Sequence, residues 1–286
     1  KENFKRAKNL LEKPDQFNFF LKAILMGWVE IGSGNIQKGL NYFEDSEYAK
    51  QLGYMSQNHL GLALAMVGNF EKADAILSKI FNNSPRNDRG MIIARAQIKA
   101  QLGQNEEAVK LLDNFLSGEN DSEIMELRRT IDAGAPVKYN YLSSPKQGAS
   151  LALYTIANAI NQEGDYSLSL LYSQLVSHID EKNPENILLI SENLKQLKQY
   201  ELAIKNYGKI SADHRSYKSV EVGRANALFM QGKEDAAIEV LKALAKANSN
   251  NPEIQTILGN TLRRSSKFEE AAISYSKSIK FISDQK

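Results

Sequence analysis

The chain has 286 residues, of which 42% are hydrophobic and 24% charged, as in a folded protein rather than a disordered one. Its 36 basic and 34 acidic residues give a net charge of +2, which provides no bulk attraction for nucleic acid or anionic lipid. No cysteine is present, which excludes disulfides, a thiolate nucleophile and cysteine-ligated metal centres. No apolar stretch approaches the roughly 20 residues that a membrane-spanning helix needs.

Residues 1–132 repeat a pattern typical of paired helices. A small residue recurs every 34 or 35 positions, at Gly39, Ala73 and Ala108. Another small residue stands twelve positions before each of them, at Gly27, Gly61 and Ala96. Small residues at both positions let two antiparallel helix backbones approach closely. We therefore expect a partial first repeat, about three full helix pairs and a lone helix near 121–132.

The breaks between the paired helices also repeat. Gly68-Asn69 and Gly103-Gln104 illustrate them, because glycine can end a helix in the left-handed conformation and a polar residue can start the next. Between the breaks, apolar residues follow the helical period. No comparable alternating segment predicts a strand, so the expected class is all-α.

The pattern fails over residues 133–147. Ala133–Pro136 should end the preceding helix, and Val137–Gln147 has no helical period and contains Pro145. We expect an irregular, non-helical connector that is more mobile than its neighbours and separates an array at 1–132 from one at 148–286. One hypothesis is that Tyr139 and Tyr141 fold into the groove of the array as an internal plug.

Residues 148–286 carry four repeats at a constant spacing of 34. The small residue of the second helix recurs at Ser169, Ala203, Ala237 and Ala271. An aliphatic residue of the first helix recurs at Ile160, Leu194, Leu228 and Leu262. This regularity predicts four further helix pairs.

These columns resemble the tetratricopeptide repeat (TPR), which combines Leu-Gly, a large residue, Ala and a second large residue over 34 positions. Leu258-Gly259, Leu262, Phe268, Ala271 and Tyr275 form one clear copy. Residues 148–175 also look weakly similar to long TPR proteins of alphaproteobacteria without an assigned role. The resemblance implies an all-α TPR-type solenoid of helical hairpins, wound as a right-handed superhelix and interrupted once near 133–147.

Catalytic patterns do not emerge from the sequence. His59, His178 and His214 lie far apart, and no zinc-protease motif, phosphate-binding loop or nucleophile elbow occurs. Carboxylate pairs such as Glu106-Glu107 begin second helices, where they favour the helix dipole. We expect no enzyme activity, no cofactor and no metal. The balanced charge likewise argues against nucleic-acid binding, including RNA binding by related helical repeats.

The resemblance implies that first helices line a concave groove, with the residue after the small one facing inward. The candidate partner-binding residues at or near these positions are Trp28, Ile24, Met66, Asn158, Glu192, Lys195, Asn226, Asn260 and Arg263. Asparagine offers a donor and an acceptor to an extended peptide, although it can equally serve to solvate the groove. Trp28 is either a binding anchor or a residue packed against a neighbouring repeat.

The sequence thus favours a non-catalytic scaffold or adaptor that binds a peptide or protein partner in its groove. The alternative is the substrate-recruiting TPR region of a larger enzyme or envelope assembly machine, with catalysis on a segment outside these residues. Because both ends lack the polar capping helices that solenoids need, we expect a longer natural protein. The identity of the partner, the compartment (cytoplasm or bacterial periplasm) and the oligomeric state stay open.

Overall fold

The computed structural model describes residues 2–13, 19–44, 53–83, 88–116, 121–249 and 251–283. Within these ranges the regular structure is helical and no strand occurs, which confirms the all-α prediction. None of the helices in the described ranges has the length and hydropathy that a membrane span requires. The chain divides into two compact units, Lys1–Thr155 and Ile156–Lys286.

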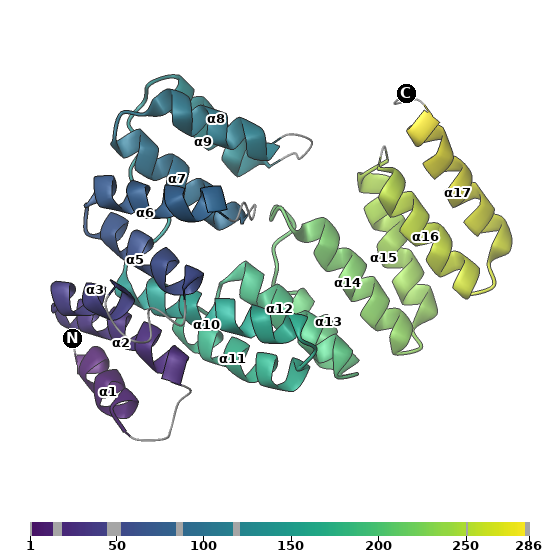
Figure 1. Ribbon diagram of the computed structural model, residues 1–286. Coiled ribbons are helices and arrows are strands. Elements are labelled where there is room, and N and C mark those ends of the chain that lie inside the picture. The colour runs from purple at the N-terminus through teal and green to yellow at the C-terminus, as the bar shows by residue number, and fades with distance from the viewer. Residues whose placement is uncertain are drawn as a thin grey trace. The chain divides into compact units, whose positions relative to one another are not determined.

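Unit 1 is built mainly from helical hairpins (Figure 1). Helices α2, α5 and α7 are the first helices of its pairs, and α3, α6 and α8 pack against them as second helices. Helix α1 packs on α2, and α9 packs on α8. The bounds are α1 Glu2–Leu11, α2 Phe19–Ser33, α3 Ile36–Glu44, α5 Tyr54–Met66, α6 Phe70–Asn83, α7 Arg89–Gln101, α8 Asn105–Leu116 and α9 Ser122–Asp132.

Unit 2 continues the same arrangement. Helix α10, Pro145–Gln162, begins in unit 1 and ends in unit 2. The pairs that follow it are α12 with α13, α14 with α15, and α16 with α17, while α11 packs on α12. The bounds are α11 Tyr166–Ile179, α12 Pro184–Gln196, α13 Tyr200–Tyr207, α14 Tyr217–Met230, α15 Glu234–Ala247, α16 Pro252–Arg264 and α17 Phe268–Ser283.

The small residues of the first helices lie under large residues of the second helices. A Cβ added to Gly61 would lie 2.5 Å from Cγ of Leu77, and one added to Gly259 would lie 2.7 Å from the ring of Tyr275. Such distances are far below van der Waals contact, so only glycine fits without a shift. The columns read from the sequence therefore correspond to the closest helix contacts of the hairpins.

The hairpin turns require a left-handed residue. Gly68 and Gly232 have φ angles of 85° and 82°. Where the repeat lacks glycine, Lys198 and Ser266 adopt φ angles of 59° and 60° in the same place. This conformation is sterically unfavourable for a residue with a side chain. The packing of the two helices therefore imposes the geometry of the turn even where the residue is not glycine.

The connector differs from the expectation at its C-terminal end. Residues 135–144 are not helical, as predicted, but α10 begins at Pro145 and not at Gly148. Proline fits the first position of a helix, where its fixed φ suits the helix and no N–H is required. The hydroxyl of Ser144 accepts a hydrogen bond from the backbone N–H of Gln147 at 3.3 Å and caps this end. The predicted mobility of the connector stays a prediction.

The division between the two units also lies later than the expected boundary at residues 147 and 148. It falls between Thr155 and Ile156, inside α10. The connector and the first part of α10 therefore belong to unit 1. The reason is that these residues pack into the main hydrophobic cluster of unit 1, to which Leu142, Ala149 and Ala152 contribute.

Candidate functional site

In each first helix of unit 1 we expect the residue after the small one to face inward. These residues are Trp28, Leu62 and Gln97, and together they define the inner face of unit 1. All three meet the same later stretch of the chain. Gly148 lies against the indole of Trp28, since a Cβ added to that glycine would be 2.4 Å from Cδ2. Leu62 belongs to the same hydrophobic cluster as Leu142. The connector and the start of α10 thus run along the inner face of unit 1.

Gln97, on α7, holds the backbone of the connector. Its carboxamide oxygen accepts hydrogen bonds from the backbone N–H groups of Asn140 and Tyr141, both at 3.0 Å. Its Nε2 donates to Oδ1 of Asn140 at 2.7 Å. One turn further along α7, Gln101 donates to the backbone carbonyl of Val137. Two amide side chains of one first helix therefore bind the non-helical connector through its main chain.

The side chains of the connector alternate between the inner face and solvent. Tyr139, Tyr141 and Leu142 pack inward, whereas Lys138 and Asn140 are exposed. This alternation is what an extended peptide shows when one of its sides lies on a surface.

Each inward tyrosine has its own place on the inner face. The ring of Tyr139 meets the ring of Phe70 edge to face, with 6.1 Å between centroids. The hydroxyl of Tyr141 lies over Gly90, where an added Cβ would be 2.4 Å away. The hydroxyl of Tyr139 is buried without a hydrogen-bond partner, and burial raises the pKa of this phenol above its ordinary value. The site for Tyr139 therefore suits an aromatic ring better than a hydroxyl.

Trp28 is fully buried, with 0% of its surface exposed. Its indole N–H donates to Nδ1 of His59 at 3.1 Å, and its ring lies 5.3 Å from that of Phe43. Ile24 is 1% exposed in the same cluster, and Met66 packs against that cluster. Trp28 and Ile24 are therefore buried in this conformation, as expected if Trp28 packs against a neighbouring segment, and a role in partner binding stays a prediction. The position of Trp28 does face inward, but the glycine and alanines of α10 cover it.

His59 stays neutral inside this cluster. It is 3% exposed, and burial lowers the pKa of its imidazole to about 4. Because Nδ1 accepts the hydrogen bond from Trp28, the ring proton must sit on Nε2 in the neutral form. The imidazole is thus a buried acceptor for the tryptophan, and it ties α5 to α2.

The predicted residues of unit 2 differ in exposure. Asn226, Asn260 and Arg263 are exposed on α14 and α16, and Asn158 is partly buried on α10. Glu192 and Lys195 come together as an ion pair at 2.7 Å on α12.

Some of these side chains already have partners on neighbouring helices. The hydroxyl of Tyr275 donates to Oδ1 of Asn260 at 2.9 Å. The hydroxyl of Tyr207 approaches Glu192 at 3.4 Å. The inner face of unit 2, defined by Asn158, Glu192, Asn226 and Asn260, is therefore polar and partly accessible.

The predicted site residues did not include Gln97 and Gln101, which make the clearest peptide-like contacts in the structure. Gln97 occupies one of the positions expected to face inward, so its place in the repeat could have identified it as a binding residue. Its partner, the connector, shows no periodicity from which the contact could be inferred.

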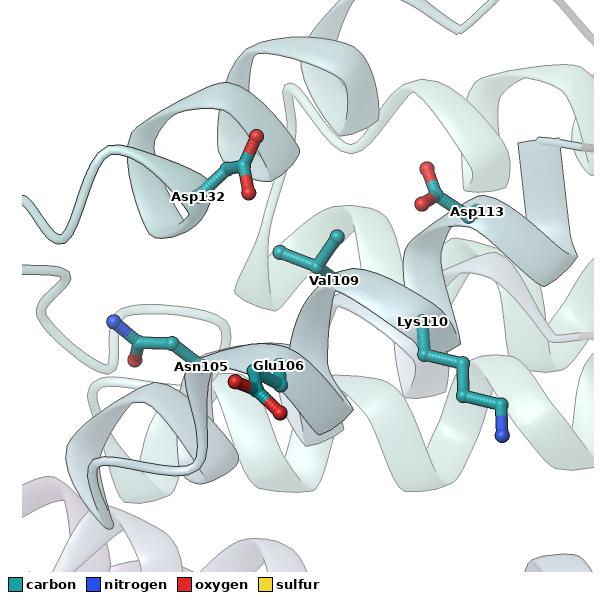
Figure 2. Close-up of a pocket in the computed structure, with 6 residues that line it drawn as sticks. All are labelled: Asn105, Glu106, Val109, Lys110, Asp113 and Asp132. Carbon is teal, nitrogen blue, oxygen red and sulfur yellow. The ribbon is translucent and has the colours of Figure 1, made fainter.

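A surface cavity of about 340 Å³ lies between α8 and the end of α9 (Figure 2). Its lining residues are Asn105, Glu106, Val109, Lys110, Asp113 and Asp132. The guanidinium of Arg128 binds Asp113 at 2.8 Å and Asp132 at 2.9 Å. The hydrogen bond from Arg128 holds the pKa of Asp113 below its ordinary value, so this carboxylate is charged at neutral pH and is not suited to donate a proton.

Comparisons with known proteins agree with the repeat pattern. Residues 194–260 match the sequence model of the tetratricopeptide repeat family. No curated protein matches the chain in sequence. Among solved structures, MamA from Desulfovibrio magneticus RS-1 is similar over 68% of this chain and 95% of its own, with 16% identity and a TM-score of 0.43.

A tetratricopeptide repeat protein from Parabacteroides merdae is similar over 92% of this chain and 93% of its own, with 17% identity and a TM-score of 0.40. These identities are too low to transfer a function. The family match at 194–260 stands inside a series of helix pairs with the same spacing and the same close helix contacts. Residues 194–260 thus belong to the tetratricopeptide repeat family.

Proposed function

We propose that this protein is a non-catalytic adaptor that binds an extended peptide segment of a partner protein on the inner faces of its helix pairs. One observation carries the proposal: the carboxamide of Gln97 binds two consecutive backbone amides of a non-helical segment. That segment belongs to the same chain, yet the contacts are those by which a groove recognises a peptide main chain. The same position in the other repeats is the natural place for a partner.

The accessible part of this surface lies on unit 2. Asn226 and Asn260 occupy the same column on successive first helices, and both are exposed. Arg263 lies about one turn after Asn260 on α16 and is exposed as well. The amide side chains of Asn226 and Asn260 can pair with the N–H and C=O groups of an extended chain, and Oδ1 of Asn260 keeps a second lone pair beside its bond from Tyr275. The guanidinium of Arg263 favours an acidic side chain nearby.

A peptide selection tests the proposal. Peptides displayed on phage are selected against the immobilised 286-residue chain, and the best are measured by fluorescence anisotropy. Asn226→Ala combined with Asn260→Ala should weaken binding at least about tenfold, since each lost main-chain contact typically contributes about 0.5–1.5 kcal/mol.

The matched control combines Glu201→Ala with Lys277→Ala, two exposed residues on the second helices α13 and α17. This control should leave the affinity unchanged. Selected peptides that bind the asparagine variant as tightly as the unmodified chain would refute the proposed site on unit 2.

A further inference from the structure

The inner face of unit 1 is occupied by its own chain in the manner of a peptide complex. Residues 137–142 (the cis segment) are non-helical with a bend at 141 and 142, place the rings of Tyr139 and Tyr141 inward and present their backbone to Gln97 and Gln101. The backbone N–H groups of Asn140 and Tyr141 donate to Gln97, the backbone carbonyl of Val137 accepts from Gln101, and Nε2 of Gln97 donates to the side chain of Asn140. Main-chain recognition of this kind does not depend on the segment being part of the same molecule.

The cis segment begins at Val137, which accepts a hydrogen bond from Gln101 and packs on a hydrophobic cluster, but the residues before it are exposed. Residues 133–136, between α9 and the segment, are all exposed, and Gly134 has a φ of 68°. Its C-terminal end continues into α10, whose Gly148 and Ala149 pack against the cluster around Trp28. To leave the inner face the segment must break the contacts of Val137, Tyr139, Tyr141 and Leu142, whereas the exposed residues 133–136 add no packing to that cost.

We propose that the inner face of unit 1 is a second peptide site, closed by the cis segment, and that it binds in trans an extended peptide with the pattern aromatic, polar, aromatic, leucine. The inference rests on the proposed function in that both assume recognition of an extended main chain, but it concerns a different set of residues. The occupant is a partner peptide that resembles Tyr139–Leu142 in its side chains. The cis segment acts as its competitor.

The structure also specifies which aromatic residue the first position prefers. The ring of Tyr139 is held against Phe70, but its hydroxyl is buried without a partner. A buried hydroxyl that makes no hydrogen bond opposes binding, because it has lost its water. A partner peptide with phenylalanine at this position should bind about fivefold tighter than one with tyrosine, which is the effect of losing one such penalty.

The cis segment competes with a partner peptide for the inner face of unit 1, and this competition sets the affinity that the partner must reach. A tethered segment acts at an effective concentration on the order of millimolar, so a partner at lower concentration displaces it only if it binds more tightly or if the segment is released. The apparent association constant equals the intrinsic one multiplied by the fraction of molecules in which the site is open, so a mostly closed protein binds more weakly. The site therefore responds to whatever loosens the cis segment.

The test uses a fluorescent peptide with the sequence of residues 136–144 and phenylalanine in place of Tyr139. Its affinity is measured by anisotropy for the unmodified chain and for an opened variant, Tyr139→Ser with Tyr141→Ser. The opened variant should bind at least about tenfold more tightly, because the intramolecular competitor is weakened. Adding Gln97→Ala to the opened variant should weaken binding again by about tenfold, since it removes the hydrogen bonds to the main chain.

Circular dichroism and the fluorescence of Trp28 establish whether the opened variant is folded. If it is not, a variant with residues 137–142 replaced by glycine and serine takes its place. A folded opened variant that fails to bind the peptide, or that binds it no better than the unmodified chain, overturns the inference.

Hydrogen exchange on the unmodified chain gives an independent readout. With peptide present above its measured dissociation constant, the amides of Asn140 and Tyr141 should exchange at least about tenfold faster, because they lose their acceptor on Gln97. Unchanged exchange would refute displacement.

The unit 2 variant Asn226→Ala with Asn260→Ala separates the two proposals. It should bind this peptide normally, and a loss of binding there would show that the peptide occupies unit 2, which overturns the inference for unit 1.

Discussion

Protonation of His59 should destabilise unit 1 in mildly acidic solution. The imidazole is 3% exposed, lies against the rings of both Trp28 and Phe43, and accepts the indole N–H through Nδ1. A second proton on the ring removes this acceptor and places a charge inside an apolar cluster. The folded chain can avoid this cost only by staying neutral or by unfolding around the histidine.

The magnitude follows from the pKa of the imidazole in the two states. Burial lowers the pKa from 6.5 to about 4, so the unfolded chain binds the proton more readily than the folded chain. The stability that this group contributes is present above pH 6.5 and is lost as the pH falls toward 4. Between pH 7 and pH 5 the loss amounts to about 2 kcal/mol by proton linkage.

Trp28 is the only tryptophan of the chain, so its fluorescence reports on the cluster that contains His59. Urea unfolding curves followed by this fluorescence, at intervals between pH 5 and pH 7, measure the effect above the range in which most carboxylates titrate.

His59→Gln keeps an acceptor for the indole but cannot titrate, and it should flatten the pH dependence. The control His178→Gln, at an exposed position, should retain it. An unchanged pH dependence in the His59 variant would show that the reasoning is wrong.

Two further substitutions, each with a control, test the packing described above. Trp28→Ala should lower the free energy of unfolding by roughly 3–5 kcal/mol, because it removes a large side chain from a core. Urea unfolding followed by circular dichroism measures this loss. As a control, Phe268→Ala at a 66% exposed position should change the free energy by no more than about 0.5 kcal/mol. Ala237→Leu should overpack the contact between α14 and α15 and lower the free energy of unfolding by about 1–3 kcal/mol. The same change at the exposed neighbour Ala236 should be nearly neutral. If both variants melt at the same temperature, the assigned register is wrong.

Glu30 is fully buried, and although burial alone would raise its pKa, hydrogen bonds from lysine and asparagine side chains lower it to about 2. Its contribution is therefore complete above pH 4.5 and lost as the pH falls toward 2. Glu30→Gln should cost about 1–2 kcal/mol at pH 7, after solvent screening of its exposed lysine partner is allowed for. Urea titrations should show the difference narrowing in acid, and a constant difference would refute the assignment.

The helix pairs could be predicted from the sequence because the information is local and repeated. Each repeat has a small residue in its first helix, such as Gly61. A small and a large residue follow at fixed sequence separations in the second helix, here Ala73 and Leu77. Close backbone approach requires this combination, so the columns could be read without knowing the fold. The left-handed turns at Lys198 and Ser266 were less evident, since neither residue prefers that conformation.

The orientation of the inward positions was also predictable, because it follows from helical periodicity within one pair. Trp28 and Leu62 lie in one hydrophobic cluster with Leu142, and Gln97 binds the neighbouring residues Asn140 and Tyr141. What covers that face was decided by tertiary structure alone. The contact joins Gln97 to Asn140 and Tyr141 over more than forty positions of the chain, and no period relates them. An extended segment carries no helical pattern, so its place depends on the surface it meets, and that surface exists only once the repeats have packed.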